Sequence, residues 1–377
     1  MTGLHTGHTS VRANAGTIPL RANPEDQTVA QALQRAGYST ALFGKWGLGD
    51  YGSAATPDKK GFDEYYGFLH QVHPHNQYTD FLWRNGRKEV LRGNLDGKKT
   101  QYAPDLIFEA SVDWLKKQKK DKPYFLYVPT TLPHQGYEVP DTAPYTGRDW
   151  PEIEKIYAAM ITRADRHIGA LLDALKASGQ EEDTAVFITS DNGAPTSSEH
   201  KVEFFRSNGP LRGVKGQVYE GGIRAPMIVR WPGRIKPGTS SDLPWSFCDF
   251  YPTAASIAGI ESPKGIDGVS MADHLRRGTT AKEVAPRLQY WEFYGFDAQK
   301  NELRPQSLSQ AARFGEWKAV RPRAGQPLEL YNLREDIGES KNLAASNPEM
   351  ATKMSAMVDG AHTPPRPHNT GSMQFVK

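Results

Sequence analysis

The segment that begins at residue 185 carries the residue types best suited to binding an anionic ester. The apolar run Ala185–Thr189 is rich in β-branched residues and is followed closely by Asp191, Asn192 and Gly193. Such a run predicts a strand buried on both faces of a parallel sheet, and open α/β sheets bind ligands just beyond the carboxyl ends of their strands. Asp191 and Asn192 offer adjacent hard oxygen ligands for Ca²⁺ or Mg²⁺. We therefore predict a divalent-cation site at this strand end.

A cation follows these two candidate ligands in a glycine-flanked segment. Lys215 lies in the string Arg-Gly-Val-Lys-Gly-Gln that begins at Arg212. A flexible ammonium group near a divalent cation is suited to holding the oxygens of an anionic ester. Asp-Asn-Gly on its own is also a common turn, so the prediction depends on the combination of this motif with the lysine segment.

Two further strand ends carry polar side chains. The expected strand Tyr38–Phe43 ends in GKWGLG, which contains Lys45, and the expected strand Tyr124–Val128 leads into Pro-His-Gln, which contains His134. Strand ends that open into one crevice bring together residues far apart in sequence. A loop lysine and a packed loop histidine are the alternative interpretations.

The elements that must position these residues alternate between helix and strand from about residue 27 to 275. Helices are expected over Gln27–Ala36, capped by Asp26, from Pro104 to about Lys120, over Glu154–Ala177 and over Trp245–Gly259. This alternation is typical of a mostly parallel sheet flanked by helices. After about residue 285, short strand-like pieces and a helix over Asn347–Val358 predict a small antiparallel subdomain. We thus expect domains at 1–284 and 285–377, and a loose proline-rich tail after Gly360.

Composition narrows the class of function. The 377 residues carry a net charge of only +3, and the KKQKK run at 116–120 suits the end of a helix better than a nucleic-acid surface. The single cysteine, Cys248, excludes an internal disulfide framework and lies in an apolar helical stretch that favours a core role. No apolar run reaches membrane-spanning length.

The chain resembles the type I sulfatases, arylsulfatase-like members of the alkaline-phosphatase superfamily. The resemblance is carried by the DNG motif, by LRGVKGQVYEGGIRAPMIVRWPG at 211–233 and by GKWGLG at 44–49, similar to the family's GKWHLG. It extends to WKAVRP and LELYNLREDIGESKNLA, which are similar to the family's C-terminal subdomain. The resemblance implies an alkaline-phosphatase-like fold and a sulfuric ester hydrolase acting on sulfated carbohydrates or aryl sulfates.

The resemblance also implies roles for individual residues. Asp191 and Asn192 would be ligands of one Ca²⁺ or Mg²⁺ ion, and Lys215 would contact the sulfuryl oxygens. Lys45 would orient the nucleophile and the sulfate, and His134 would contact sulfate and serve the leaving group.

The histidine-rich loop HQVHPHNQY at 70–78 invites two interpretations. Three histidines suggest a metal site, but this spacing is more typical of hydrogen-bonding or substrate-contacting loop residues. Because several sulfatases carry a similar loop over the site, we expect His75 and Asn76 to face substrate.

Two departures from the family pattern bear on activity. Gly47 stands where GKWHLG has histidine, so another group, for instance from the 70–76 loop, is expected to take that place. The family signature C/S-x-P-S-R-x-x-L-x-T-G, whose first residue becomes the formylglycine nucleophile, aligns its ninth position with Met1, which places the modified residue about eight positions upstream. No Cys-x-Pro-x-Arg or Ser-x-Pro-x-Arg string occurs in the chain.

These departures lead to an expectation about the chain as printed. Without the nucleophile segment and the first aspartate pair, it should bind metal weakly and leave sulfate esters intact. An incomplete reading frame or fragment is the expected explanation. Two alternatives stay open: a phosphomonoester or phosphonate hydrolase of the same superfamily, and a non-catalytic remnant that binds sulfated glycan through Lys45, His134 and Lys215. The family's habit favours a periplasmic or secreted location.

Overall fold

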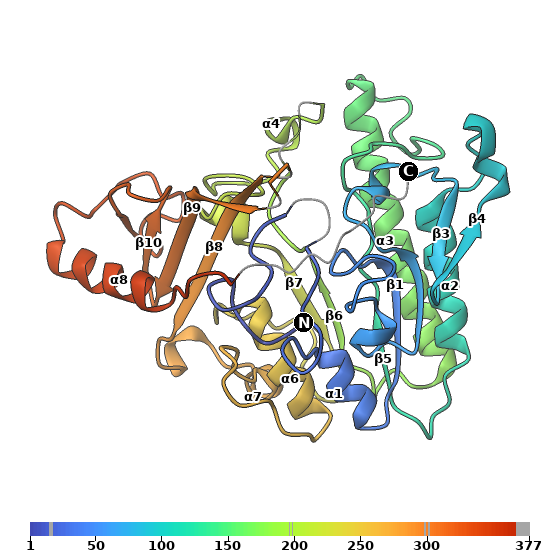
Figure 1. Cartoon of the computed structure of the whole chain (residues 1–377), viewed down its shortest axis with the longest axis horizontal. Coiled ribbons are helices and arrows are strands. Elements are labelled where there is room, and N and C mark those ends of the chain that lie inside the picture. Colours follow the sequence, from blue (N-terminus) through green and yellow to red (C-terminus); the bar gives the residue numbers. More distant parts are fainter. Residues whose placement is uncertain (15–17, 196, 198, 298, 301, 367–377) are drawn as a thin grey trace. The chain divides into compact units, whose positions relative to one another are not determined.

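The computed structural model describes residues 1–14, 18–195, 197, 199–297, 299–300 and 302–366. Contacts divide the chain into two compact units (Figure 1). The α/β unit contains residues 18–183, 197 and 199–201, and the discontinuous unit contains residues 1–14, 184–195 and 202–366. The candidate site residues are distributed over both units.

A five-stranded sheet forms the centre of the α/β unit, with the order β4-β3-β2-β1-β5. Its strands are β1 (Ser39–Lys45), β2 (Glu64–Phe68), β3 (Phe81–Arg84), β4 (Arg87–Val90) and β5 (Tyr124–Tyr127). β1 pairs in parallel with β2 and β5, and the hairpin β3–β4 adds antiparallel pairs beyond β2. Four of the five strands therefore run in one direction, which confirms the expected mostly parallel sheet.

Three helices belong to this unit: α1 (Val29–Arg35), α2 (Ala103–Lys116) and α3 (Glu152–Ser178). Ile107 and Trp114 of α2 pack against Phe43 of β1 in one apolar core, as their helical spacing predicted. The expected cap of α1 was wrong. Thr28, rather than Asp26, caps the helix in a capping box with Gln31.

The discontinuous unit contains a two-stranded sheet that corrects one expectation. β6 (Val186–Thr189) pairs in antiparallel fashion with β7 (Met227–Arg230), not within a parallel sheet. β6 is only partly buried, and Ile228 on β7 is 62% exposed. A short apolar run does not reveal its partner, because buried parallel strands and half-buried antiparallel strands share the same composition.

The expected C-terminal subdomain appears as a four-stranded antiparallel sheet with the order β11-β10-β9-β8. Its strands are β8 (Leu288–Asp297), β9 (Glu302–Phe314), β10 (Trp317–Arg321) and β11 (Glu329–Asn332). Met354 and Val358 of the final helix, α8 (Pro348–Gly360), are buried against this sheet. β9 begins nine residues before the expected Ala311, because it continues past a bulge as a long hairpin with β8.

The remaining helices of this unit are short: α4 (Val202–Phe205), α5 (Glu220–Ile223), α6 (Phe250–Ile257) and α7 (Ala272–Arg277). The helix expected over Trp245–Gly259 is a 3₁₀ turn, Phe247–Asp249, followed by α6. Within the ranges given above, no helix combines the length and the apolar character needed to cross a membrane.

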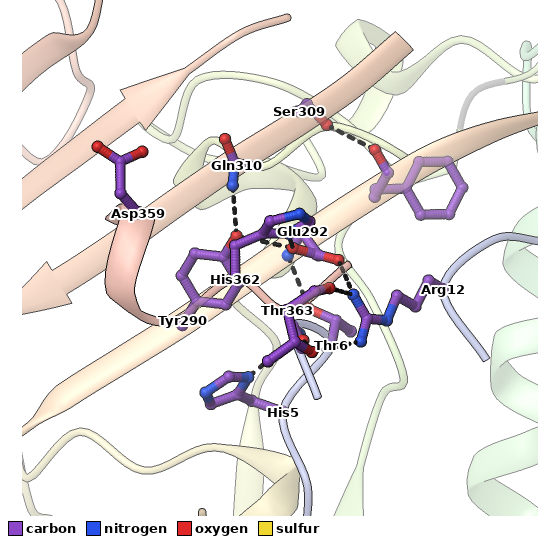
Figure 2. A network of polar contacts seen from close by, with 12 residues as sticks. His5, Thr6, Arg12, Tyr290, Glu292, Ser309, Gln310, Asp359, His362 and Thr363 are labelled. Atoms are coloured by element: carbon purple, nitrogen blue, oxygen red, sulfur yellow. Dashed lines mark hydrogen bonds and ion pairs between the residues drawn. The ribbon is translucent and has the colours of Figure 1, made fainter. Parts of the chain in front are cut away.

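Buried ionic contacts tie both ends of the discontinuous unit to its sheet (Figure 2). Glu292 on β8 accepts hydrogen bonds from Arg12 at 3.0 Å and from the Tyr290 hydroxyl at 2.7 Å, and its carboxylate lies 2.8 Å from His362. The Arg12 guanidinium also donates to the Thr363 hydroxyl at 2.9 Å. The expectation of a loose tail was therefore wrong for residues 362 and 363, and the rest of that expectation falls mainly on 367–377, outside the described residues.

Candidate functional site

Lys45 lies at the carboxyl end of β1, where the sheet holds the backbone of the GKWGLG segment on two sides. The amide of Lys45 donates to the carbonyl of Pro129 at 2.9 Å, and the amide of Trp46 donates to the carbonyl of Phe68 at 2.8 Å. The indole of Trp46 is buried and donates to the carbonyl of Ala55 at 2.7 Å. The backbone on either side of Lys45 is therefore fixed, and its half-buried side chain starts from the strand end that the sequence predicted.

Gly47 stands where the family pattern has a histidine, and its backbone angle and its neighbour Gln71 favour a glycine at this position. Its φ of +68° lies in the left-handed region, where glycine is favoured. Gln71 donates from its amide to the Gly47 carbonyl at 3.0 Å, and a Cβ at position 47 would lie 2.3 Å from that same Gln71 nitrogen. A side chain at position 47 would thus be strained and would displace Gln71, which belongs to the loop from which a replacement was expected.

The structure brings His75 and His134 together from two loops of the α/β unit. Their rings stack at a centroid distance of 4.9 Å with an interplanar angle of 25°. Gly136 makes this approach possible, because a Cβ there would lie 2.1 Å from the carbonyl oxygen of His75. The stacked pair places two imidazoles side by side in loops of the α/β unit, and open α/β sheets bind ligands beyond the carboxyl ends of their strands.

The other histidines of this loop serve the structure rather than a metal. His73 is packed edge-on against Phe68 and tilted against Phe81, and one ring nitrogen lies 2.6 Å from the Thr79 hydroxyl. Burial lowers the pKa of His73 to about 4. Among the described residues, the histidines at 70, 73 and 75 do not converge as a group of metal ligands.

In the discontinuous unit, the Asp-Asn-Gly segment and the Lys215 loop are joined through their backbones. The amide of Lys215 donates to the carbonyl of Ala194 at 2.8 Å, and the amide of Gly193 donates to the carbonyl of Gly222 at 3.0 Å. The structure thus brings the backbone of Lys215 next to the segment that carries Asp191 and Asn192.

Glycines are required where these two loops touch. A Cβ on Gly193 would lie 1.8 Å from the carbonyl oxygen of Gly221, and one on Gly222 would lie 2.1 Å from that of Gln217. A Cβ on Gly221 itself would lie 2.3 Å from the carbonyl oxygen of Gly213. These glycines are therefore explained by backbone-to-backbone packing. A side chain at Gly193 would force the two loops apart, and one at Gly221 or Gly222 would collide with the backbone of the Lys215 loop itself.

The oxygens of Asp191 and Asn192 fit a hard divalent cation in kind but not in number. The amide nitrogen of Asn192 donates to the carbonyl of Gly193 at 2.9 Å, which leaves its side-chain oxygen as an acceptor. Asp191 is exposed, and its carboxylate makes no hydrogen bond or ion pair with another described residue. Ca²⁺ takes about six to eight oxygen ligands, so these two side chains do not form a complete cage.

A buried ion triad anchors the Lys215 loop to the antiparallel sheet. Lys318 on β10 is fully buried, and its ammonium lies 2.9 Å from a carboxylate oxygen of Glu220 and 2.8 Å from one of Glu339. Glu339 also accepts the backbone amide of Glu220 at 2.7 Å. Glu220 lies five positions after Lys215, so this triad fixes the far end of the loop.

The two carboxylates that share Lys318 have pKa values shifted in opposite directions. Burial favours the neutral acid in both carboxyls. At Glu220, Lys318, Arg313 and Arg224 together outweigh burial, and the pKa of Glu220 is lowered. At Glu339, burial outweighs the same ammonium and the pKa is raised. Sequence analysis did not find this triad, although WKAVRP and YEGGIR were both recognised as motifs.

A histidine–aspartate cluster near the first residues was also missed, although the spacing of His5 and His8 is a detectable signal. Asp267 lies 2.8 Å from a ring nitrogen of His8 and 3.5 Å from one of His5, and this is the one three-residue cluster with metal-ligand character in the described ranges. The other ring nitrogen of His5 accepts the amide of Gly7 at 3.1 Å. A neutral His5 must then carry its proton on the nitrogen that faces Asp267, so the cluster is a hydrogen-bonded one.

Comparison with known proteins agrees with this picture. A family model for sulfatases matches residues 1–260, and a model for the C-terminal region of N-sulphoglucosamine sulphohydrolase matches residues 214–360. A sulfatase from Formosa agariphila is 34% identical over 67% of this chain and 48% of its own length. Human arylsulfatase A is 28% identical over 92% of this chain and 72% of its own length.

A solved structure is similar over almost the whole chain. The crystal structure of Ps i-CgsB in complex with k-i-k-neocarrahexaose is 28% identical, with a TM-score of 0.79 over 98% of this chain and 83% of that chain. The fold and the sequence motifs thus define a sulfatase-like α/β protein with a C-terminal antiparallel sheet. The chain belongs to the type I sulfatase family, whose members are hydrolases of sulfuric ester bonds.

Proposed function

We propose that this chain provides the substrate-binding groups of a sulfuric ester hydrolase for sulfated carbohydrates. The observation that carries the proposal is the stacked pair His75–His134 in the α/β unit, which contains Lys45 at the end of β1. In the other unit, the amide of Lys215 is bonded to Ala194 in the segment that carries Asp191 and Asn192. The relative with a bound carrahexaose supports a carbohydrate substrate.

In the α/β unit, Lys45 and His134 bind the sulfate group. An ammonium group at a fixed strand end stabilises negative charge on the sulfuryl oxygens, and a histidine holds a proton for the leaving oxygen. His75, stacked on His134, and Asn76 contact the sugar that carries the sulfate.

In the discontinuous unit, Lys215 contacts the sulfuryl oxygens, and Asp191 and Asn192 serve as two ligands of Ca²⁺ or Mg²⁺. Their two oxygens form an incomplete cage, so metal binding by this chain is weak. The chain contains no Cys-x-Pro-x-Arg or Ser-x-Pro-x-Arg string in which formylglycine forms. We therefore propose sulfate-ester recognition by this chain without turnover, in a secreted or periplasmic setting.

The test is a titration of the 377-residue chain with three forms of one monosaccharide: its sulfate ester, its phosphate ester and the unmodified sugar. The proposal predicts that the sulfate ester binds most tightly and the unmodified sugar least tightly. Tighter binding of the phosphate ester would favour a phosphomonoester or phosphonate hydrolase instead. Turnover of 4-nitrophenyl sulfate by this chain would contradict the assignment of the nucleophile.

A further inference from the structure

A buried histidine–glutamate pair packs against the loop that carries His134. The side chains of His200 and Glu154 are 0% and 1% exposed, and one ring nitrogen of His200 lies 2.6 Å from a carboxylate oxygen of Glu154. The other carboxylate oxygen accepts the backbone amide of Lys201 at 2.9 Å. A buried carboxylate requires partners of this kind, so the pair fixes the chain at His200 to α3. No sequence motif pointed to either residue.

The ring of His200 is enclosed by two tyrosines of the same α/β unit. It stacks on Tyr157 of α3 at a centroid distance of 3.7 Å and an interplanar angle of 14°, and Tyr137 meets it in a T-shaped arrangement at 6.2 Å. Tyr157 lies three positions after Glu154, so α3 presents both side chains on one face. Tyr137 is buried and also meets Tyr157 edge-on at 5.9 Å. The three rings therefore form one buried aromatic cluster.

Tyr137 connects this cluster to the loop of His134. The loop touches His75 through Gly136, the residue before Tyr137, where a Cβ would lie 2.1 Å from the carbonyl oxygen of His75. On the other side, the amide of His134 donates to the carbonyl of Thr131 at 2.8 Å. A loop keeps a side chain in a defined geometry only where packed neighbours hold it. The stacking of His134 on His75 at 4.9 Å therefore depends on the place of Tyr137.

We propose that His200 is a positioning residue for the sulfate-binding loop. Its ring, held by Glu154 and Tyr157, fixes Tyr137, and Tyr137 keeps His134 in its stacked arrangement with His75. The effect on sulfate binding rests on the proposed function, because His134 must contact the sulfate group. The effect on the stacking does not rest on it, since the two rings are stacked in the chain without a ligand.

The first measurement is the proton NMR spectrum of the chain without sugar. The C2 proton of His134, assigned from its loss in His134→Gln, should be displaced by the ring current of His75, and His75→Gln gives its unstacked position. His200→Asn keeps a donor near Glu154 but removes the ring that packs on Tyr137. This variant should move the His134 resonance to the unstacked position, and an unchanged resonance would overturn the proposal.

The second measurement is a calorimetric titration with a sulfated monosaccharide at a low temperature at which each variant is folded. His200→Asn should bind about tenfold more weakly than the wild-type chain, because the loop must then be ordered on binding. Tyr137→Leu removes the same ring contact from the side of the loop and should show both changes. The double variant Glu154→Gln, His200→Phe keeps a ring on Tyr137 without an unpaired carboxylate, so it should bind as the wild-type chain does.

Ile107→Ala is the matched control, since it removes a buried side chain from the core under α2. It should lower the Tm and leave the affinity unchanged. Wild-type affinity in both His200→Asn and Tyr137→Leu would overturn the proposal, and so would an equal loss in Ile107→Ala, which would show general destabilisation. A shifted His134 resonance in His200→Asn, together with no binding of the sulfated sugar by the wild-type chain, would keep the positioning role and overturn the proposed function.

Discussion

Replacing Lys318 by methionine tests the ion triad that anchors the Lys215 loop. The Lys318 ammonium lies 2.9 Å from Glu220 and 2.8 Å from Glu339, and among the described residues it is the one ammonium group within 3 Å of both. Methionine removes this charge and keeps a similar side-chain volume. Both carboxylates are at most 5% exposed, so water does not replace the lost partner. After the change, Glu220 keeps a 3.5 Å contact with Arg224, which is half exposed, and the more distant positive charge of Arg313.

The magnitude follows from this burial. Removing one partner of a buried ion pair costs roughly 3–5 kcal/mol, because a charge is left uncompensated in the interior. We expect Lys318→Met to lower the free energy of unfolding of the discontinuous unit by about that amount. Arg334→Met is the matched control: Arg334 is 73% exposed and its contact with Glu316 spans 3.5 Å, so the loss should stay below about 1 kcal/mol.

The assay is urea unfolding followed by tryptophan fluorescence, since Trp291 and Trp317 belong to the sheet that contains Lys318. Adding Glu339→Gln to Lys318→Met should recover part of the loss, because one uncompensated carboxylate is removed. A Lys318→Met chain as stable as Arg334→Met would refute the reasoning, and so would a double variant less stable than Lys318→Met.

Three further predictions concern single groups. Burial lowers the pKa of His73 from 6.5 to about 4, so the unfolded chain takes up the proton first and stability falls as pH drops from 6.5 towards 4. This loss of roughly 3 kcal/mol should be absent in His73→Gln. Identical pH profiles of unfolding for the two chains would contradict the prediction. Gly193→Ala should destabilise the chain by about 1–3 kcal/mol in thermal unfolding, because its Cβ would lie 1.8 Å from the carbonyl oxygen of Gly221, whereas Gly147→Ala has no atom within 4 Å and should be neutral. Burial raises the pKa of the Cys248 thiol to about 11. An aromatic disulfide reagent at pH 8 should therefore label the native chain far more slowly than the urea-unfolded chain. Equal labelling rates would show that the thiol is accessible.

The regular elements were largely predictable from sequence because their signals are local. The helical spacing of Ile107 and Trp114 found α2, and the turn-separated pieces after residue 285 found the antiparallel sheet, with β10 (Trp317–Arg321) placed at its observed bounds. The partner of β6 was missed, since the apolar run over 185–189 fits a parallel or an antiparallel neighbour equally well.

The candidate site also has residues that the sequence selected and contacts that it did not reveal. Strand-end position and motif selected Lys45, His134 and Lys215. In the structure, the amide of Lys45 is bonded to Pro129 and that of Lys215 to Ala194. The stacking of His75 on His134 and the burial of Lys318 depend on contacts between distant segments, which spacing along one chain does not encode. The roles of these residues in binding sulfate stay predictions.

The most direct test of the central claim is the dependence of binding on the sulfate group itself. A sulfated sugar and its desulfated form are titrated into the wild-type chain, into Lys45→Ala and into Lys215→Ala, with the exposed helix-end variant Lys117→Ala as the charge-matched control. We expect the wild-type and control chains to prefer the sulfated sugar, and each of the other variants to bind it roughly 10- to 100-fold more weakly, as expected for loss of a charged hydrogen bond. Equal binding of the sulfated and desulfated sugars by the wild-type chain would contradict it.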